Sequence, residues 1–249
     1  MNGLLAGRRV LVTGGMSGIG AAVVHTCGSM GADGVVLDLA AAIERSESRW
    51  PAVAADVTDE QSVEQAVQST VARLGGLDLM IAAAGVVPSW RRPTELDLEE
   101  LDRVLAINVR GVAATVKYAA PHLTEGAAIT IVGSLNSWRG DPNIAVYAAS
   151  KHAVLGLIRS YALALGPSGI RVNGVAPGPI ATRALLTRMD SRTENTGLSV
   201  AEALAQAAAG TALRRIATAQ NVADTIAFLS SYLAAGITGQ LIAVDGGIL

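Results

Sequence analysis

A tyrosine and a lysine four residues apart, Tyr147 and Lys151, are the pair with the clearest chemical potential in this sequence. At that spacing two side chains share one face of a helix. A phenol with its ordinary pKa of about 10 is a poor acid or base at neutral pH, but a neighbouring ammonium favours the phenolate and lowers that pKa. The pair could therefore pass a proton to or from an alcohol oxygen, or it could be a simple pair on a helix surface.

Two polar residues upstream could complete a proton-transfer site. Ser134 follows an expected strand at residues 127–132, where its hydroxyl group could hydrogen-bond a substrate oxygen. Asn108 falls in an expected long helix at residues 98–123 and could hold a water molecule against Lys151. The candidate catalytic residues are therefore Asn108, Ser134, Tyr147 and Lys151.

A glycine-rich turn, TGGMSGIG at residues 13–20, joins an expected strand at 8–13 to an expected helix at 19–30. Glycine lets the backbone turn tightly and approach a pyrophosphate, and the helix N-terminus offers N–H groups and a positive dipole end to the anion. The alternative is an ordinary connection between a strand and a helix, but the placement favours a dinucleotide. The residues expected to contact the cofactor here are Gly14, Ser17, Gly18, Ile19 and Gly20.

An aspartate at the end of the next expected strand, 35–38, indicates which dinucleotide binds. Asp38 could accept hydrogen bonds from the adenosine ribose and would repel a 2′-phosphate. No arginine or lysine stands at Gly15, Met16 or Leu39 to hold such a phosphate. We therefore expect NAD as the cofactor rather than NADP, the alternative being that Asp38 is a solvent-facing aspartate.

A second acidic residue follows the third expected strand, at residues 52–55. Asp56 could accept a hydrogen bond from the adenine, and Val57 could form an apolar wall beside it. Asp56 could instead simply cap the turn that follows.

Expected strands and helices alternate along most of the chain, which is the pattern of a parallel sheet with helices on both faces. The fold class expected is α/β: a Rossmann-like, doubly wound parallel sheet in a three-layer αβα arrangement. Because no low-complexity linker divides the chain, residues 1–249 are expected to form a single dinucleotide-binding catalytic domain. Residues 183–210 are polar and interrupt the alternation, and we expect a substrate-side insertion that is either a mobile lid or a static surface excursion. Further helices are expected at about 58–74 and 145–165, and further strands at 77–83 and 171–175.

The composition excludes several classes of partner. The formal net charge is −2 with both signs scattered, which gives no electrostatic footprint for nucleic acid or an anionic membrane. Uninterrupted apolar runs of about 18 residues and a signal-peptide pattern are both absent, so we expect a cytoplasmic protein without a membrane partner. A single cysteine, Cys27, excludes an intrachain disulfide. None of the three histidines has a clustered acidic or sulfur partner, so no metal is expected.

Taken together, the motifs resemble the classical short-chain dehydrogenase/reductase (SDR) family over nearly the whole chain. In the family, as here, the catalytic serine and tyrosine are 13 residues apart. The family's enoyl reductases place the lysine farther from the tyrosine, and its extended epimerases are longer, so the resemblance favours neither. The matching motifs stand in family order: TGGMSGIG at 13–20, DV at 56–57, Asn108, Ser134, YAASK at 147–151, N-x-x-x-P-G-x-x-x-T at 173–182 and the C-terminal ITGQLIAVDGG.

The resemblance implies an NAD-dependent alcohol dehydrogenase or ketoreductase that interconverts a secondary alcohol and a ketone by hydride transfer. Tyr147 would be the general acid–base, and Lys151 would lower its pKa and hold the nicotinamide ribose. Ser134 would orient the carbonyl, and Asn108 would anchor a proton-relay water. The family also implies a homotetramer. The rival hypothesis is a dinucleotide-binding sensor without turnover, which need not keep the proton-transfer residues. Further cofactor contacts are expected at Ala83, Gly85, Pro177, Gly178, Ile180 and Thr182.

One motif departs from the family pattern. After the fourth strand the family usually has N-N-A-G, whereas this chain has A-A-A-G at residues 82–85. The absent asparagine side chains normally support the sheet, so we expect a local hydrogen bond to be made differently. Backbone atoms make most of the cofactor contacts there, and cofactor binding is expected to survive.

Candidate substrate residues lie beyond the ends of two strands and in the insertion. Trp90 and Trp138 each follow a strand end, where ligands bind in open α/β sheets. Each could line an apolar substrate pocket, or could serve packing or subunit contact. The substrate expected is a hydrophobic or cyclic secondary alcohol or ketone. The candidate substrate residues are Trp90, Asn136, Trp138 and Leu185, with Leu186 and Met189 as further residues that could close over a hydrophobic substrate.

Overall fold

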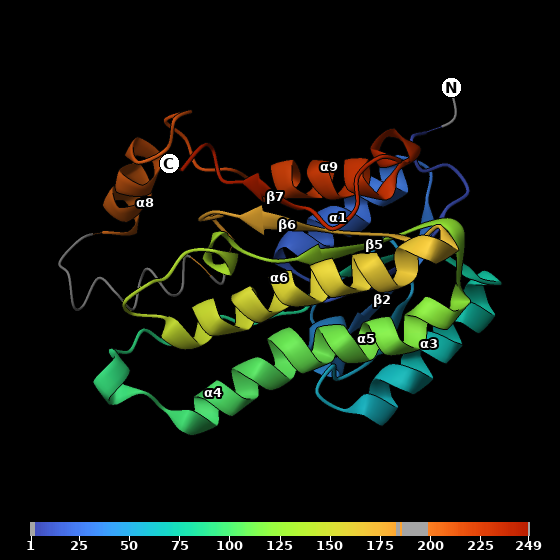
Figure 1. Cartoon of the computed structure of the whole chain (residues 1–249), viewed down its shortest axis with the longest axis horizontal. Helices are drawn as coiled ribbons and strands as arrows, with labels where there is room; N and C mark the ends of the chain where they lie inside the picture. Colours follow the sequence, from blue (N-terminus) through green and yellow to red (C-terminus); the bar gives the residue numbers. More distant parts are fainter. Residues whose placement is uncertain (1–2, 183–184, 186–198, 249) are drawn as a thin grey trace.

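A seven-stranded parallel sheet forms the centre of the molecule in the computed structural model, which describes residues 3–182, 185 and 199–248. The strand order is β3-β2-β1-β4-β5-β6-β7, with every neighbouring pair parallel (Figure 1). Helices cover both faces, as the sequence predicts for a doubly wound α/β fold. The strands are β1 Arg9–Thr13, β2 Asp33–Asp38, β3 Ala52–Ala54, β4 Leu77–Ala82, β5 Leu123–Val132, β6 Arg171–Pro177 and β7 Leu241–Val244.

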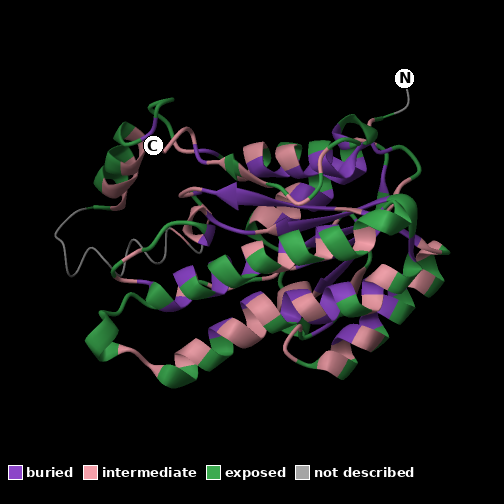
Figure 2. Cartoon of the chain, viewed as in Figure 1, coloured by how far each residue is buried: buried purple, intermediate pink, exposed green. Residues whose placement is uncertain are grey.

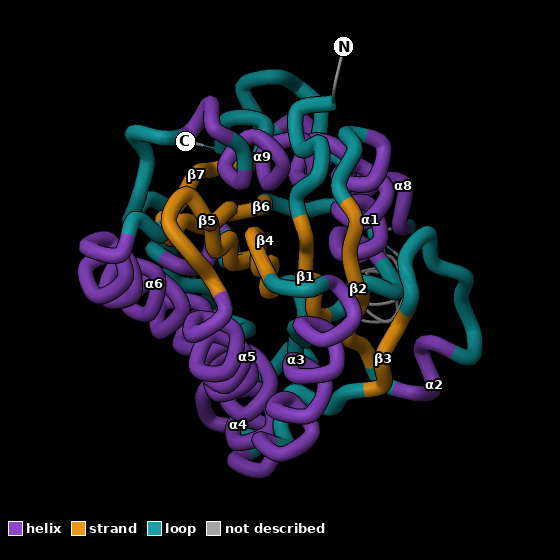
Figure 3. The backbone as a smooth tube through the Cα atoms, turned by 90° about the vertical axis from the view of Figure 1, so that its right-hand side faces the viewer, coloured by secondary structure: helices purple, strands orange, loops and turns teal. Residues whose placement is uncertain are grey.

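Helices form one layer on each side of the sheet. In the end-on view, α3, α5 and α6 lie on one side of the strands, and α1 and α9 lie on the other (Figure 3). This three-layer arrangement confirms the expected fold class. The helices are α1 Gly18–Ser29, α2 Ala40–Ile43, α3 Glu60–Leu74, α4 Leu98–Leu105, α5 Gly111–Ala119, α6 Ala145–Leu165, α8 Val200–Ala209 and α9 Ala219–Ser230.

The order of the strands creates a switch point between β1 and β4. The chain moves outward from β1 through β2 to β3, returns to β4 beside β1, and then moves outward in the other direction to β7. In doubly wound sheets ligands bind outside the carboxyl ends of the strands at this switch point. The arrowheads of β6 and β7 point toward the end of the molecule where α8 lies, which marks this edge (Figure 1).

Local sequence signals set the ends of several helices. The Asp59 carboxylate accepts a hydrogen bond from the Gln61 N–H and so caps α3 at its N-terminus, while Gly75 at φ +71° ends the helix in the left-handed region. Asp97 caps α4 by accepting from the N–H groups of Glu99 and Glu100. Aspartate at the N-cap satisfies donors that the first helical turn leaves unpaired.

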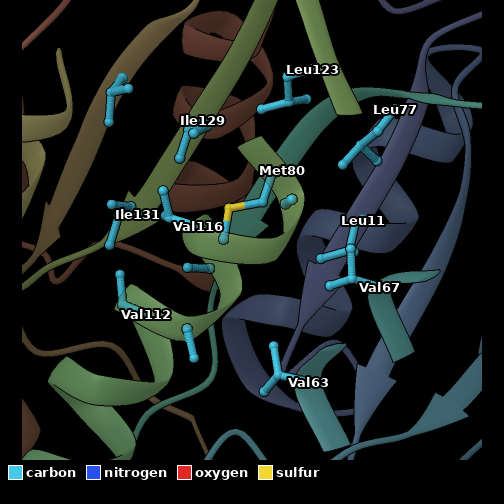
Figure 4. Close-up of a cluster of buried hydrophobic side chains, with 14 of the residues drawn as sticks. Leu11, Val63, Val67, Leu77, Met80, Val112, Val116, Leu123, Ile129 and Ile131 are labelled. Atoms are coloured by element: carbon cyan, nitrogen blue, oxygen red, sulfur yellow. The ribbon is translucent and has the colours of Figure 1, made fainter. Parts of the chain in front are cut away.

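The buried apolar side chains form two clusters, one on each face of the sheet. Figure 2 shows that the buried residues lie along the strands and in the helices on either side of them. Figure 4 shows the first cluster, where Leu11 and Met80 of the sheet pack with Val63 and Val67 of α3 and Val116 of α5. The second cluster joins the opposite face to α1 and α9. Because both faces are covered, the strands read as continuous apolar runs rather than alternating ones.

The long helical region predicted at residues 98–123 is confirmed, because helical turns continue from Leu98 to His122. The sequence did not indicate that a π turn at Ala106–Arg110 joins α4 to α5, or that the last turn, Ala120–His122, is a 3-10 helix. Pro121 lacks an N–H group and cannot continue a regular helix, so the chain leaves the helix here and enters β5 at Leu123. Strand β5 therefore begins four residues earlier than the apolar run at residues 127–132 predicts.

Most of the predicted insertion at residues 183–210 lies outside the described residues. Its last part forms α8, which Ser199 caps in a reciprocal pair with Glu202. Leu186 and Met189 also lie outside the described residues. Among the helices that are described, none combines the length and the apolar character needed to cross a membrane.

Candidate active site

The residues singled out from the sequence meet at the carboxyl edge of the sheet. Gly14 follows β1, Asp38 ends β2 and Gly85 follows β4, while Ser134 follows β5 and Pro177 ends β6. Parallel strands place all of their carboxyl ends at the same edge. The fold thus gathers at one crevice residues that are widely separated in the chain.

The glycine turn is too crowded at two positions for any side chain. A Cβ atom on Gly14, whose φ is +70°, would lie 2.6 Å from the backbone of Ala84, and one on Gly20 would lie 2.0 Å from the carbonyl oxygen of Gly14. Gly18, at φ +53°, faces Thr182, whose Cγ2 would be 3.6 Å from its Cβ. The turn after β1 therefore lies against the loop after β6, as a dinucleotide spanning both would require.

The N-terminus of α1 suits a phosphate group. Within the described chain, Ser17 occupies the N-cap position in extended conformation without a side-chain capping hydrogen bond, whereas α3 and α4 are capped by aspartates. The first N–H groups of α1 are thus uncapped, and the positive end of the helix dipole points to the crevice. Together with the glycine turn, this end of α1 fits the pyrophosphate of a dinucleotide.

Asp38 is half-buried and bonded to the glycine turn. One carboxylate oxygen accepts from the Met16 N–H at 2.9 Å, and the other accepts from the Leu39 N–H at 2.8 Å. Each carboxylate oxygen has a second lone pair, so these bonds are compatible with accepting a ribose hydroxyl. The carboxylate therefore also holds the turn, a role that the sequence did not indicate.

Asp56 makes the turn-capping contacts that its sequence context leaves open. One carboxylate oxygen accepts from both the N–H and the hydroxyl group of Thr58, at 2.9 and 2.8 Å. Val57 lies against α5, because a Cβ on Gly111 would come within 2.9 Å of it. Contact of this pair with adenine remains a proposal.

The residues after β4 show how the A-A-A-G segment is supported. The Ala83 N–H donates to the carbonyl oxygen of Thr13 at 3.1 Å, and the Ala84 N–H donates to the Thr13 hydroxyl at 3.4 Å. Thr13 is buried at the end of β1. Its hydroxyl and carbonyl groups thus hold this segment in place of the asparagine side chains that the family pattern has.

Lys151 is buried against the ring of Tyr147. Lys151 is only 5% exposed, and its Nζ atom lies 5.7 Å from the centre of the Tyr147 ring. Nζ donates to the carbonyl oxygen of Val132, at the end of β5, at 2.9 Å. Burial disfavours the ammonium and lowers the pKa of Lys151 to about 8. This lysine therefore remains mostly charged at pH 7.

Asn108 is fully buried in the π turn, and its side chain hydrogen-bonds to the loop after β4 and to α6. Its Oδ1 accepts from the Val86 N–H at 2.8 Å, while its Nδ2 donates to the Val86 carbonyl at 2.9 Å and to the Ser150 hydroxyl at 3.1 Å. A Cβ on Gly85 would lie 3.2 Å from Oδ1 and 3.8 Å from Nζ of Lys151. Both amide hydrogens are used, and only an Oδ1 lone pair remains to hold a water molecule over Gly85.

Ser134 is fixed at the end of β5 by a reciprocal pair of hydrogen bonds. Its hydroxyl accepts from the Asn136 N–H at 3.1 Å, and its own N–H donates to the Ser137 hydroxyl at 3.2 Å. The Asn136 side chain donates to the carbonyl oxygen of Arg139 at 3.4 Å. Ser134 is thus oriented at the crevice, and Asn136 holds the loop that follows.

The segment after β6 contains the remaining candidate cofactor contacts. The Gly178 N–H donates to the carbonyl oxygen of Val244, and a Cβ on Gly178 would come within 2.8 Å of Asp245. Ile180 is buried and Thr182 is half-buried. The C-terminal segment after β7 therefore supports the loop expected beside the nicotinamide.

The candidate substrate residues lie in the segments that follow β4, β5 and β6. Trp90 and Trp138 are 39% and 42% exposed in the loops after β4 and β5. The Leu185 N–H donates to the Thr182 hydroxyl at 3.4 Å. Sequence reasoning missed Glu100, whose carboxylate accepts from the Ser89 N–H and from Nε of Arg91, on either side of Trp90. No motif marks such a residue, because its partners are brought to it only by the fold.

This crevice, with a glycine turn at its switch point, defines a dinucleotide-binding α/β protein. A family model described as enoyl-(acyl carrier protein) reductase matches residues 14–249. Short-chain dehydrogenase reductase 3a of Arabidopsis thaliana is 40% identical over 257 residues, which cover 99% of this chain and 97% of that protein. The chain belongs to the short-chain dehydrogenase/reductase family of oxidoreductases, whose members use a nicotinamide cofactor.

Two further proteins illustrate the likeness. The mitochondrial (-)-isopiperitenol/(-)-carveol dehydrogenase of Mentha piperita is 40% identical over 256 residues, covering 98% of this chain and 94% of that protein. The structure of the ligand-free aldohexose dehydrogenase of Thermoplasma acidophilum superposes with a TM-score of 0.91 at 26% identity, covering 98% of this chain and 94% of that one. The fold is therefore shared over almost the full length.

Proposed function

We propose that this protein is an NAD-dependent oxidoreductase that interconverts a secondary alcohol and a ketone, with Tyr147 as general acid–base. The observation that carries the proposal is the burial of Lys151 against the Tyr147 ring, at the strand edge where Ser134 lies. A buried ammonium costs free energy unless it is paired and hydrogen-bonded, and strongly perturbed groups gather at functional sites. A sensor without turnover has no need of this pair.

When bound, the nicotinamide supplies or accepts the hydride. The Tyr147 hydroxyl gives a proton to the oxygen of the ketone in reduction, and takes one from the alcohol in oxidation. The Lys151 ammonium stabilises the tyrosinate that remains after reduction. Ser134 donates a hydrogen bond to the same substrate oxygen and holds it within reach of Tyr147.

The proton that Tyr147 exchanges must pass between the site and bulk water. Oδ1 of Asn108 and Nζ of Lys151 both lie close to Gly85, because a Cβ there would be 3.2 Å and 3.8 Å from them. A water molecule there would accept from the ammonium and donate to the amide oxygen, so Asn108 anchors the outer end of the relay. The burial of Asn108 keeps this acceptor in one position.

NAD is the proposed cofactor because the Asp38 carboxylate, at the end of β2, would accept hydrogen bonds from the adenosine ribose and would repel a 2′-phosphate. The residues that would hold the cofactor are those after β1, β2, β4 and β6. Phosphate contacts would come from the uncapped N–H groups of α1. Asp56 and Val57 would contact the adenine, and Thr182 would lie beside the phosphates, opposite Gly18.

A hydrophobic or cyclic secondary alcohol is the proposed substrate. Two exposed tryptophans, Trp90 and Trp138, lie in the loops after β4 and β5, and the second of these loops also contains Ser134. The relative from Mentha piperita is named for isopiperitenol and carveol, which supports a cyclic substrate here. The matched family model is named instead for enoyl reduction, but the four-residue spacing of Tyr147 and Lys151 favours the alcohol chemistry.

The test is to follow NADH formation at 340 nm with a panel of cyclic and linear secondary alcohols, with NADP in parallel. Reduction of an enoyl thioester by NADH and by NADPH is the comparison reaction. We expect turnover of cyclic alcohols with NAD. Turnover of the thioester alone would contradict the alcohol chemistry, and NAD binding without turnover of any compound would favour the sensor.

A further inference from the structure

Ser150, which stands next to Lys151 in the YAASK motif, joins the active-site helix to the π turn. Its hydroxyl donates to the carbonyl oxygen of Tyr147 at 2.8 Å and accepts from Nδ2 of Asn108 at 3.1 Å. Both Ser150 and Asn108 are completely buried. The hydroxyl is therefore the contact between α6, which carries the proposed acid–base pair, and the residue proposed to anchor the relay.

The direction of these hydrogen bonds is fixed by chemistry. A carbonyl oxygen only accepts, so the single hydroxyl hydrogen of Ser150 is donated to Tyr147. The Ser150 oxygen must then accept, and the amide nitrogen of Asn108 is the donor that faces it. This arrangement directs Oδ1 of Asn108 away from Ser150, toward the Val86 N–H and the space over Gly85.

Two hydrogen bonds hold the Asn108 amide to Val86 in the loop after β4. The third bond, to Ser150, uses the remaining Nδ2 hydrogen and ties the same amide to α6. Asn108 lies in a π turn, in which the Gly111 N–H donates to the carbonyl oxygen of the residue five positions earlier, Ala106. Turns of this kind are frequently found at functional sites.

We propose that Ser150 is a positioning residue that holds the Asn108 amide in one orientation, so that its Oδ1 stays beside Gly85, close to the Lys151 ammonium. The inference rests on the proposed alcohol–ketone chemistry for its effect on rate. The contact itself can be tested without turnover. Ser150 touches neither substrate nor cofactor in this scheme and acts through Asn108.

The central variant is Ser150→Ala, which removes only the hydroxyl group. A buried Nδ2 hydrogen then has no acceptor, and the amide can move to satisfy it. We expect kcat to fall about tenfold, while KM for NAD changes less than about twofold, because one hydrogen bond is lost outside the cofactor site. Ser150→Thr keeps the hydroxyl and should restore at least half of the wild-type kcat.

The matched control is Thr115→Val in α5. Thr115 is also buried, and its hydroxyl donates to a carbonyl oxygen of its own helix, that of Gly111, at 2.7 Å. This variant also loses one buried hydroxyl bond, but it has no contact with Asn108. We expect its kcat to equal that of the wild type, and melting temperatures of all variants would be measured to identify any that unfold.

Hydrogen exchange provides the readout that does not depend on turnover. The Val86 N–H donates to Oδ1 of Asn108, so a peptide containing Val86 should exchange faster in Ser150→Ala than in the wild type or in Thr115→Val. Unchanged exchange together with kcat within twofold of the wild type would overturn the inference. An equal loss of kcat in Thr115→Val, or in a folded Ser150→Thr, would do the same.

Failure of the proposed function gives a different pattern. If the wild type oxidises no alcohol but Val86 is exposed specifically by Ser150→Ala, the chemistry is wrong and the positioning contact stands. If the wild type is active and Ser150→Ala affects neither rate nor exchange, the chemistry stands and the positioning role is wrong.

Discussion

Tyr147 and Lys151 share one face of α6, but their environments differ. The tyrosine is half-buried at the crevice, whereas the lysine is buried against its ring. Tyr147→Phe removes the one hydroxyl that can exchange a proton with the substrate and leaves the ring over Lys151. We expect kcat to fall at least about 100-fold. NAD affinity, measured by calorimetry, should remain within a few-fold of the wild type, and retained turnover would contradict the role of Tyr147.

The buried ammonium of Lys151 should lower the free energy of unfolding of the protein, although the proposed reaction requires this charge. Its pKa falls from 10.5 to about 8 because burial disfavours the charged form. Keeping it charged in the fold costs about 3 kcal/mol. Lys151→Met removes this cost and the bond to Val132, and we expect a net gain of about 1–2 kcal/mol in the free energy of unfolding at pH 6.5, with no activity.

The pH dependence of that gain follows from the direction of the shift. Below pH 8 the lysine is charged in both the folded and the unfolded wild type, so the cost is constant. Between pH 8 and 10.5 the unfolded chain binds more protons than the folded one, and the wild type gains stability as pH rises. The advantage of Lys151→Met, measured by urea unfolding, should shrink over that interval, and a gain independent of pH would exclude the burial of charge as its cause.

Asp38 combines a proposed role in cofactor choice with a structural one, and two variants separate them. Asp38→Asn removes the charge but keeps an oxygen that can accept from the Met16 N–H. Asp38→Ala removes both. We expect Asp38→Asn to raise kcat/KM for NADP relative to NAD about tenfold, because repulsion of the 2′-phosphate is lost.

Asp38→Ala should show the same change in preference with weaker binding of both cofactors and a lower melting temperature. Steady-state kinetics with each cofactor provide the measurement. An unchanged ratio in Asp38→Asn would show that the carboxylate does not discriminate between the cofactors.

At the scale of elements, periodicity and glycine placement predict the sheet and most helices. The apolar runs at β1, β2 and β4 and the helix α6 lie within a residue or two of their expected positions. The π turn could not be predicted, because Ala106–Arg110 has an ordinary helical composition and its wide turn is stabilised by Asn108 bonding to Val86 and Ser150. Such a turn depends on contacts from other elements, which local sequence does not encode.

The candidate site likewise contains some residues that the sequence predicts and others that only the fold reveals. Residues that belong to spaced motifs, such as Tyr147 and Gly14, are found from sequence because chemistry restricts their type and position. Glu100, which holds the loop around Trp90, belongs to no motif, and Ser150 lies inside the YAASK motif although the sequence did not indicate a role for it. Their roles become visible only when the fold brings their partners together.

The loop after β4 depends on α4 for its position. Glu100, 14% exposed at its side chain, accepts from the Ser89 N–H at 3.1 Å and from Nε of Arg91 at 3.2 Å. The Arg91 N–H in turn donates to the Asn143 carbonyl oxygen just before α6, at 2.9 Å. Trp90 lies between the two residues that Glu100 holds, so α4 and α6 together fix the segment that carries it.

Glu100→Ala should release this loop without touching the acid–base pair. We expect KM for a bulky cyclic alcohol to rise about fivefold, the effect of losing one or two surface hydrogen bonds, with kcat nearly unchanged. Glu100→Gln keeps an acceptor for the Ser89 N–H and should show a smaller rise. Equal effects on a small linear alcohol and on a cyclic one would contradict a role of Trp90 in the substrate pocket.

At the scale of the whole molecule, several large apolar side chains remain exposed in the single chain. Leu163 on α6 is 81% exposed and Tyr232, after α9, is 75% exposed. Exposed apolar side chains of this size are typical of surfaces that associate. We expect a homotetramer, with contacts through the long helices and the C-terminal strand, and light scattering should give a mass close to four times the 25.3 kDa of one chain.

Leu163→Glu tests whether the exposed face of α6 is one of those contacts. In an isolated chain this substitution lies in solvent and should leave the melting temperature unchanged, whereas in a subunit interface it would bury an unpaired carboxylate. We expect the mass to fall and to depend on protein concentration, while Leu163→Ala keeps the larger assembly. A single-chain mass for the wild type at every concentration would contradict the tetramer. Loss of assembly without loss of folding in Leu163→Glu would place α6 at the interface, where it could also stabilise the helix that carries Tyr147 and Lys151.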